Sequence, residues 1–205
     1  TYIARLSALV NKSTATTTVG VLYPLTGVWA NTADGRPNAR ARELGQTYED
    51  LIDGLFARGV DVHVIDETFV TGARLEKGVL RQGKLTVDLV ILPPTPALQR
   101  ATARRLQAFA NGGGRVIAVG ERATGSSDAG GGDRSVIRVM RELFKHDASG
   151  KRGDKIGRGR THGFAADDPK LMDSLRDVID PVTQIGSDAT DIALASRKID
   201  GAQLA

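Results

Sequence analysis

Four residues with side chains suited to ligand binding follow predicted strands of a sheet. Glu67 and Glu121 each come directly after a strand, and Thr26 and Trp29 lie just beyond another. Ligands of open α/β sheets bind outside the carboxyl ends of the strands. The face of an indole ring stacks on apolar surface, such as one face of a sugar, while carboxylates accept hydrogen bonds from hydroxyl groups. These residues therefore predict a carbohydrate-binding cleft; alternatively, Trp29 packs against a neighbouring domain or covers the end of the sheet.

A chemical reaction at this edge is a weaker hypothesis. Glycoside hydrolysis needs two carboxylates about 5–10 Å apart, and the distance between Glu67 and Glu121 along the chain cannot pair them. Glu67 also occupies the place of a ribose-binding acid, but the glycine fingerprint and the P-loop that bind phosphates are absent from the sequence. No histidine (His63, His146 or His162) has a visible catalytic partner, and the chain has no cysteine. We therefore expect no catalytic residue, metal ligand or cofactor.

The elements that would position these residues alternate between strands and helices. A helix ending at Gly59 follows the first strand, and a helix opening at Pro96 and stopped by glycines 112–114 follows the third. The apolar runs predict strands over residues 18–23, 60–65, 88–92 and 115–119. Strands that are apolar on both faces indicate parallel pairing covered by helices on each side. We expect a doubly wound α/β domain, flavodoxin-like with strand order 2-1-3-4 rather than a classical dinucleotide fold.

Smaller elements complete this prediction. Residues 78–81 and 84–86 indicate a hairpin, and residues 126–132 are a low-complexity segment that we expect to be mobile. Asp133 is expected to begin one later helix, and Asp167 or Asp168 another.

The net charge of +4 is concentrated in a glycine-rich segment, residues 151–163. Because it has no aromatic residue to stack on a base, we interpret it as a solvated, mobile loop rather than a nucleic-acid site. No apolar run approaches the roughly 20 residues that span a bilayer, so neither nucleic acid nor membrane is an expected partner. The composition leaves the compartment open.

Both ends of the chain resemble parts of other domains. Residues 2–10 show a helical apolar face, residues 190–196 alternate like a strand, and residues 197–201 begin a hairpin for which we expect no return strand. We therefore expect residues 1–15 to end a preceding domain and residues 188–205 to begin a following β domain. The α/β domain itself would occupy residues 16–187.

Several short motifs together resemble one family context. They are Tyr2-Ile3-Ala4-Arg5-Leu6-Ser7, Val19-Gly20-Val21-Leu22-Tyr23-Pro24 with Trp29, Gly83-Lys84-Leu85 with Asp88-Leu89-Val90-Ile91-Leu92-Pro93, and Phe109 with Gly112-Gly113-Gly114-Arg115-Val116-Ile117. This set is similar to the class I glutamine-amidotransferase-like, flavodoxin-like domain of large bacterial glycoside hydrolases, of the α-L-rhamnosidase-like type or the β-galactosidase trimerisation-domain type.

The resemblance implies a three-layer α/β/α domain between a catalytic (β/α)₈ barrel and a β-sandwich, both in the same parent chain. The hydrolytic carboxylates would lie on the barrel, and the cysteine of the amidotransferases has no counterpart here. It implies a non-catalytic role in packing, oligomerisation or rimming the carbohydrate substrate's site, with a homo-oligomer as a possible partner state. Two alternatives stay open: a stand-alone module that binds a sugar or nucleotide, and an autonomous hydrolase using Glu67, Glu121 or His162.

Overall fold

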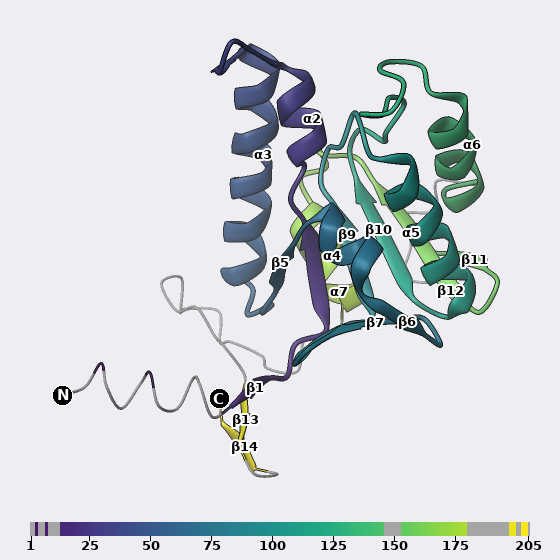
Figure 1. The fold of residues 1–205 in the computed structure, drawn as a ribbon. Helices are drawn as coiled ribbons and strands as arrows, with labels where there is room; N and C mark the ends of the chain where they lie inside the picture. Colours follow the sequence, from purple (N-terminus) through teal and green to yellow (C-terminus); the bar gives the residue numbers. More distant parts are fainter. Residues whose placement is uncertain are drawn as a thin grey trace.

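A mixed six-stranded sheet, five of whose strands run parallel, forms the centre of the chain. The computed structural model describes residues 13–145 and 153–179, the strands 197–199 and 202–204, and the helical positions Ile3 and Ser7. The sheet has the order β11-β12-β10-β9-β2-β5, formed by β2 (Val19–Leu22), β5 (His63–Ile65), β9 (Leu89–Leu92), β10 (Arg115–Val119), β11 (Asp154–Ile156) and β12 (Gly159–Phe164). Only β11 is antiparallel to its neighbour. The expected α/β class and the 2-1-3-4 order of the first four parallel strands are confirmed (Figure 1).

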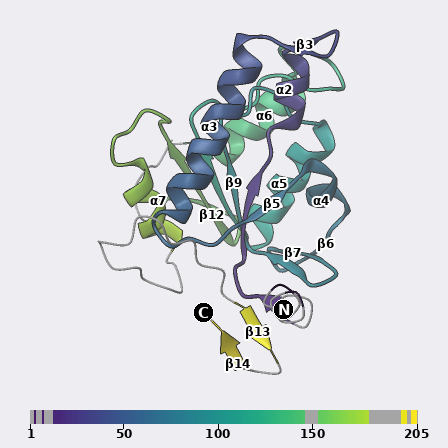
Figure 2. The same cartoon turned by 90° about the vertical axis from the view of Figure 1, so that its left-hand side faces the viewer.

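Helices cover both faces of this sheet. The six described helices are α2 (Leu25–Ala30), α3 (Ala39–Phe56), α4 (Glu67–Gly72), α5 (Arg100–Gly112), α6 (Arg134–Leu143) and α7 (Leu171–Ile179). Figure 2 shows α3 and α7 on one side of the sheet and α4 and α5 on the other. Helix α6 packs beside α5.

The alternation of side chains along β9 explains the two-sided cover. Leu89 and Ile91 belong to a core shared with α3 and α7. Val90 and Leu92 point the other way, into a core shared with α4, α5 and α6. All four side chains are at most 3% exposed, so an uninterrupted apolar strand is what this position requires.

Helix α5 begins later than expected. The predicted start was Pro96, but the helix begins at Arg100. The residues just before it form hydrogen bonds with the segment around Gly125 instead. Ala97 forms a parallel bridge with Gly125, and the Leu98 N–H donates to the Gly125 carbonyl at 3.1 Å. Leu98 is nevertheless buried.

The prediction of a solvated loop over residues 151–163 was wrong where the structure describes it, from residue 153 on. Strands β11 and β12 form a hairpin there, and β12 pairs in parallel with β10. Thr161 and His162 are 1% and 2% exposed. Thr161 Oγ1 donates to the Leu143 carbonyl at 2.5 Å, so hydrogen bonding replaces apolar character as the reason for burial.

Two other segments are more regular than expected. The region after β2 contains α2 and the short antiparallel pair β3 (Thr32–Ala33) and β4 (Arg36–Pro37), and the region after β5 contains α4. The predicted hairpin is confirmed as β7 (Val79–Gln82) and β8 (Leu85–Val87), with β6 (Arg74–Glu76) as a third strand.

The two ends of the described chain meet. Strand β1 (Thr14–Ala15) pairs with β13 (Arg197–Ile199), which pairs with β14 (Ala202–Leu204). The expectation of no return strand was therefore wrong, because β14 is that strand. The predicted strand over residues 190–196 and all of the helix over residues 2–10 except Ile3 and Ser7 lie outside the described residues.

Within the described part of the chain, no helix has the length and apolar character that crossing a membrane requires.

Candidate functional site

The parallel strands all end at one edge of the sheet, opposite the small sheet formed by β1, β13 and β14 (Figure 1). Glu67 enters this edge as the first residue of α4. The preceding residue, Asp66, caps that helix by accepting a hydrogen bond from the Phe69 N–H at 2.6 Å. This cap fixes the first turn of α4 and therefore the direction of the Glu67 side chain.

Both carboxylate oxygens of Glu67 are used by the fold. Oε1 accepts a hydrogen bond from Thr26 Oγ1 in α2, and Oε2 accepts one from the Gln99 backbone N–H at 2.7 Å. Glu67 is 5% exposed. Gln99 is the N-cap residue of α5, and its own side chain makes no capping bond. Glu67 thus ties α2 to the start of α5, where a negative charge is favourable.

Glu121 is held by a different partner. Its carboxylate forms an ion pair with Arg40 of α3, and Arg40 also contacts Glu43 at 2.8 Å. The Glu121 side chain is 42% exposed. Glu67 and Glu121 therefore each have their own partners, which is not the arrangement of two carboxylates acting on one glycosidic bond.

Thr26 and Trp29 do share a pocket. This pocket is about 270 Å³ in volume and is lined by Thr26, Trp29, Ala30, Ala97, Gln99, Ser126 and Ser127. Trp29 is 67% exposed, so its indole ring is available to a ligand or to another protein surface. We call these seven residues the Trp29 pocket. Glu67 lies directly behind it, bonded to two residues of its wall.

Sequence reasoning missed Gln99, Ser126 and Ser127. The segment 126–132 was expected to be mobile, yet the structure closes it: Ser126 and Gly130 exchange two backbone hydrogen bonds of 2.8 Å. Ser126 Oγ also donates to Asp133 at 2.5 Å. The sequence does place Ser126 seven residues before the helix-capping Asp133. The glycines between them favoured the interpretation of a mobile segment instead.

Asp133 holds one residue of this pocket, Ser126, in place. It caps α6 by accepting from the Ser135 N–H at 2.9 Å, and it pairs with Arg100 at 2.7 Å. Hydrogen bonds from Ser126 and Arg100 lower the pKa of Asp133 to about 2. The carboxylate is therefore ionised over the physiological pH range.

The two histidines that the structure describes, His63 and His162, do not join this site. His162 is buried in β12, with its ring parallel to Phe164 at 6.4 Å between centroids. The expected solvated loop over residues 151–163 would have left His162 exposed, and this was wrong because β12 is an internal strand. The His63 ring nitrogen Nε2 lies 3.2 Å from the Thr17 carbonyl oxygen, and burial lowers the pKa of His63. His146 lies outside the described residues.

Metal ligands do not gather in the described ranges either: no group of three or more His, Cys, Asp and Glu side chains is placed to hold an ion.

Comparison with known proteins identifies the fold. No family model and no curated protein sequence matches the chain. Among solved structures, it is similar to a β-galactosidase from Bacillus circulans sp. alkalophilus, with a TM-score of 0.65 and 12% identity over 94% of this chain and 35% of that one. Gan42B, a GH42 β-galactosidase from G. stearothermophilus, matches with a TM-score of 0.61 and 16% identity over 90% of this chain and 33% of that one.

A rhamnosidase from Novosphingobium sp. PP1Y matches with a TM-score of 0.59 and 19% identity, over 98% of this chain and 18% of that one. This chain thus spans about a third or less of the length of these three neighbours. At such identities the likeness concerns the fold, and the fold is shared with one part of much longer glycoside hydrolase chains.

Proposed function

We propose that this chain is a non-catalytic accessory domain of a glycoside hydrolase. The observation that carries the proposal is the asymmetry of the structural matches, which cover 90–98% of this chain but 18–35% of β-galactosidase and rhamnosidase chains. An accessory domain is expected to match in this way. Its partners would be a catalytic barrel and a β-sandwich of the same parent chain, and a homo-oligomer is compatible with this role.

We also infer which kind of accessory domain this is. Its fold would be a flavodoxin-like, three-layer domain related to the glutamine amidotransferases. The strand order and the helices on both sheet faces support this type. No cysteine is present to supply the amidotransferase nucleophile. Residues 1–15 and 188–205 would then belong to the neighbouring domains.

The bonding of the two candidate acids supports a non-catalytic role. A general acid or base must reach the substrate with its carboxyl group, and both oxygens of Glu67 already accept hydrogen bonds within the fold. Glu121 is neutralised by Arg40.

The test is hydrolysis of nitrophenyl β-galactoside and nitrophenyl α-rhamnoside by the chain and by the parent protein that contains it. We expect turnover by the parent protein and none by the chain. Turnover by the chain that disappears in Glu67→Gln, while Glu43→Gln retains it, would overturn the proposal. Glu43 is a matched control because it is an exposed glutamate on α3.

The Trp29 pocket favours a second candidate, a module that binds a small molecule such as a sugar or nucleotide. Trp29 supplies an exposed ring, and Gln99 and Ser127 supply exposed polar groups at the wall. Under the accessory-domain proposal the same pocket would rim the substrate site of the parent enzyme.

A thermal-shift series with galactose, rhamnose and adenosine monophosphate separates the two candidates. A module that binds its ligand alone should show a shift that is lost in Trp29→Ala and kept in Trp29→Phe. If none of the three raises Tm, a stand-alone module for these ligands is excluded and the accessory role is favoured.

A further inference from the structure

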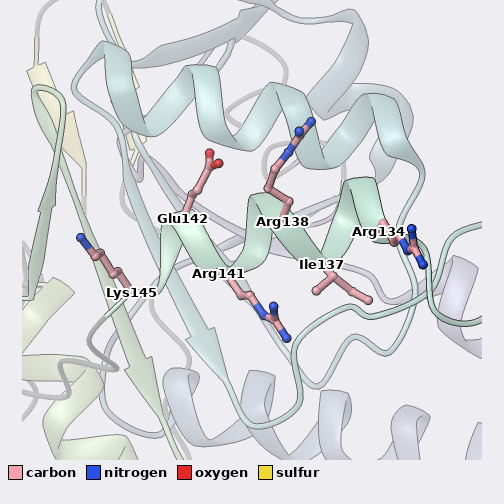
Figure 3. A pocket seen from close by; sticks show the side chains of 6 residues that line it. All are labelled: Arg134, Ile137, Arg138, Arg141, Glu142 and Lys145. Carbon is pink, nitrogen blue, oxygen red and sulfur yellow. The ribbon is translucent and has the colours of Figure 1, made fainter.

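The outward side of α6 carries charge that the fold does not use. Arg134, Arg138, Arg141 and Lys145 are all exposed, and with Ile137 and Glu142 they line a shallow hollow of about 660 Å³. We call these six residues the α6 face. Figure 3 shows their side chains spreading along the helix, with Ile137 between arginines.

Five arginines elsewhere in the described chain are held by carboxylates in ion pairs: Arg40, Arg58, Arg74, Arg100 and Arg115. Single exposed arginines such as Arg36 and Arg81 are not, but the α6 face places four cations around one hollow. Among the described residues, no cation of the α6 face has such a partner. Its one acid, Glu142, instead accepts a hydrogen bond from Gln107 of α5.

The spacing of these cations along the sequence destabilises α6 through charge repulsion. Within α6, Arg134 and Arg138 are four residues apart and Arg138 and Arg141 are three apart, whereas Lys145 lies two residues beyond the end of the helix. Like charges at these separations repel on a helix surface. Arg134 is also the first residue of α6, where a positive charge opposes the helix dipole. An anionic partner would relieve both effects.

Two features favour a polypeptide over a nucleic acid as that partner. Ile137 is a half-buried aliphatic side chain among these cations, and an apolar side chain of a polypeptide can cover it. The exposed large hydrophobic residues of the described chain include no aromatic on α6, whereas single-stranded nucleic acids stack on aromatic platforms.

We infer that the α6 face is a docking surface for an acidic polypeptide segment that carries aliphatic side chains between its carboxylates. Guanidinium groups bind carboxylates through paired hydrogen bonds, and Ile137 contacts the aliphatic residues. From Arg134 to Leu143, the two ends of α6, the helix rises about 13.5 Å. A partner helix of about two to three turns, or about four residues of extended chain, covers that length. This inference does not depend on the proposed glycoside hydrolase role.

The experiment is a titration of the full chain into a fluorescein-labelled peptide of about 12 residues with alternating pairs of Glu and Leu, followed by anisotropy. Peptides with Gln in place of Glu, and with Ser in place of Leu, are compared, together with a single-stranded oligonucleotide of similar length. The variant pair Arg138→Gln and Arg141→Gln removes the centre of the α6 face. Arg36→Gln with Arg81→Gln is the matched control, since both of these arginines are exposed and lie elsewhere.

We expect the Glu/Leu peptide to bind, and the α6 variant to weaken binding about tenfold or more while the control pair changes it little. Ile137→Asn should weaken the Glu/Leu peptide more than the Glu/Ser peptide, which a purely electrostatic attraction would not do.

Three results would overturn the inference: no binding of the Glu/Leu peptide, equal weakening by the control pair, or tighter binding of the oligonucleotide that depends on Arg138 and Arg141. Self-association of the chain in sedimentation velocity that is abolished by the α6 variant would also overturn it, because a second copy would then be the occupant.

Discussion

Glu67 and the α6 face both place charged side chains on helices, but the surroundings of these charges are opposite. Glu67 is buried, and both of its oxygens accept hydrogen bonds that join α2, α4 and α5. The α6 face is exposed, and none of its cations forms an ion pair within the described chain. A charge that the fold has bonded on every side contributes stability, whereas a charge left over on the surface is available for a partner.

Removal of the Glu67 carboxylate tests this contrast with the largest expected effect. Glu67→Ala leaves the Gln99 N–H and the Thr26 hydroxyl without their acceptor. Since hydrogen bonds to charged groups contribute about 1.5–3 kcal/mol each, we expect the free energy of unfolding to fall by about 3 kcal/mol. Urea unfolding followed by circular dichroism measures it.

The conservative variant Glu67→Gln should recover part of this loss, since an amide oxygen can accept one of the two bonds. A loss below about 0.5 kcal/mol, typical of surface substitutions, in Glu67→Ala would show that Glu67 does not tie the helices together.

The cap of α6 predicts a pH dependence of intermediate size. The pKa of Asp133 is lowered to about 2 in the folded chain, below the value of about 3.9 of a free aspartate. Its contribution is therefore present above about pH 4 and is lost as the pH falls toward 2. Asp133→Asn should lower Tm at pH 7 and flatten the decline of Tm between pH 4 and pH 2.

Thermal melts across this range, with Asp128→Asn as a second acid of the same loop, measure the effect. An unchanged acid dependence in Asp133→Asn would mean that other carboxylates control it.

The exposed pair of Glu121 with Arg40 lies between the two extremes. Both side chains are about 40% exposed, at 42% and 38%, and exposed ion pairs contribute about 0–1 kcal/mol. We expect Glu121→Gln to reduce the free energy of unfolding by less than about 1 kcal/mol, and less at high salt. A loss as large as that of Glu67→Ala would remove the distinction drawn between the two acids.

Substitution on the α6 face should have the smallest effect on stability, with the opposite sign. Arg138→Gln relieves its repulsion with Arg134 and Arg141, each worth about 0.2–0.5 kcal/mol. Tm should stay the same or rise slightly at low salt, and the difference should vanish at high salt. Arg100→Gln is the contrasting variant, because Arg100 pairs with Asp133 and its loss should lower Tm. A clear fall of Tm in Arg138→Gln would mean that this residue is bonded within the fold.

Part of the candidate site was predictable. The strand ends located Thr26, Trp29, Glu67 and Glu121 at one edge, because parallel strands deliver their carboxyl ends together. In the structure Thr26 donates a hydrogen bond to Glu67 and also lines the Trp29 pocket. Glu121 instead pairs with Arg40 in a helix 81 residues away along the chain, a distance over which residue spacing gives no guidance.

The sequence by itself determined the α/β class, four of the parallel strands and the two longer helices between them, α3 and α5. It could do so because the period of apolar residues reports which faces of a helix or strand are buried. The order 2-1-3-4 was favoured because right-handed crossovers leave few topologies, and the shorter helices α2 and α4 were not predicted. The run Leu89–Leu92 is the clearest case, since its two faces fill the two cores.

Only the tertiary structure decided where polar residues and glycines are buried. In β12, a Cβ on Gly159 would lie 2.1 Å from the Gly114 carbonyl oxygen, and Thr161 is bonded to the Leu143 carbonyl. Glu67 is buried by partners 41 and 32 residues away. Such burial depends on hydrogen bonds and close backbone approach between distant segments, and no periodicity in the sequence records either.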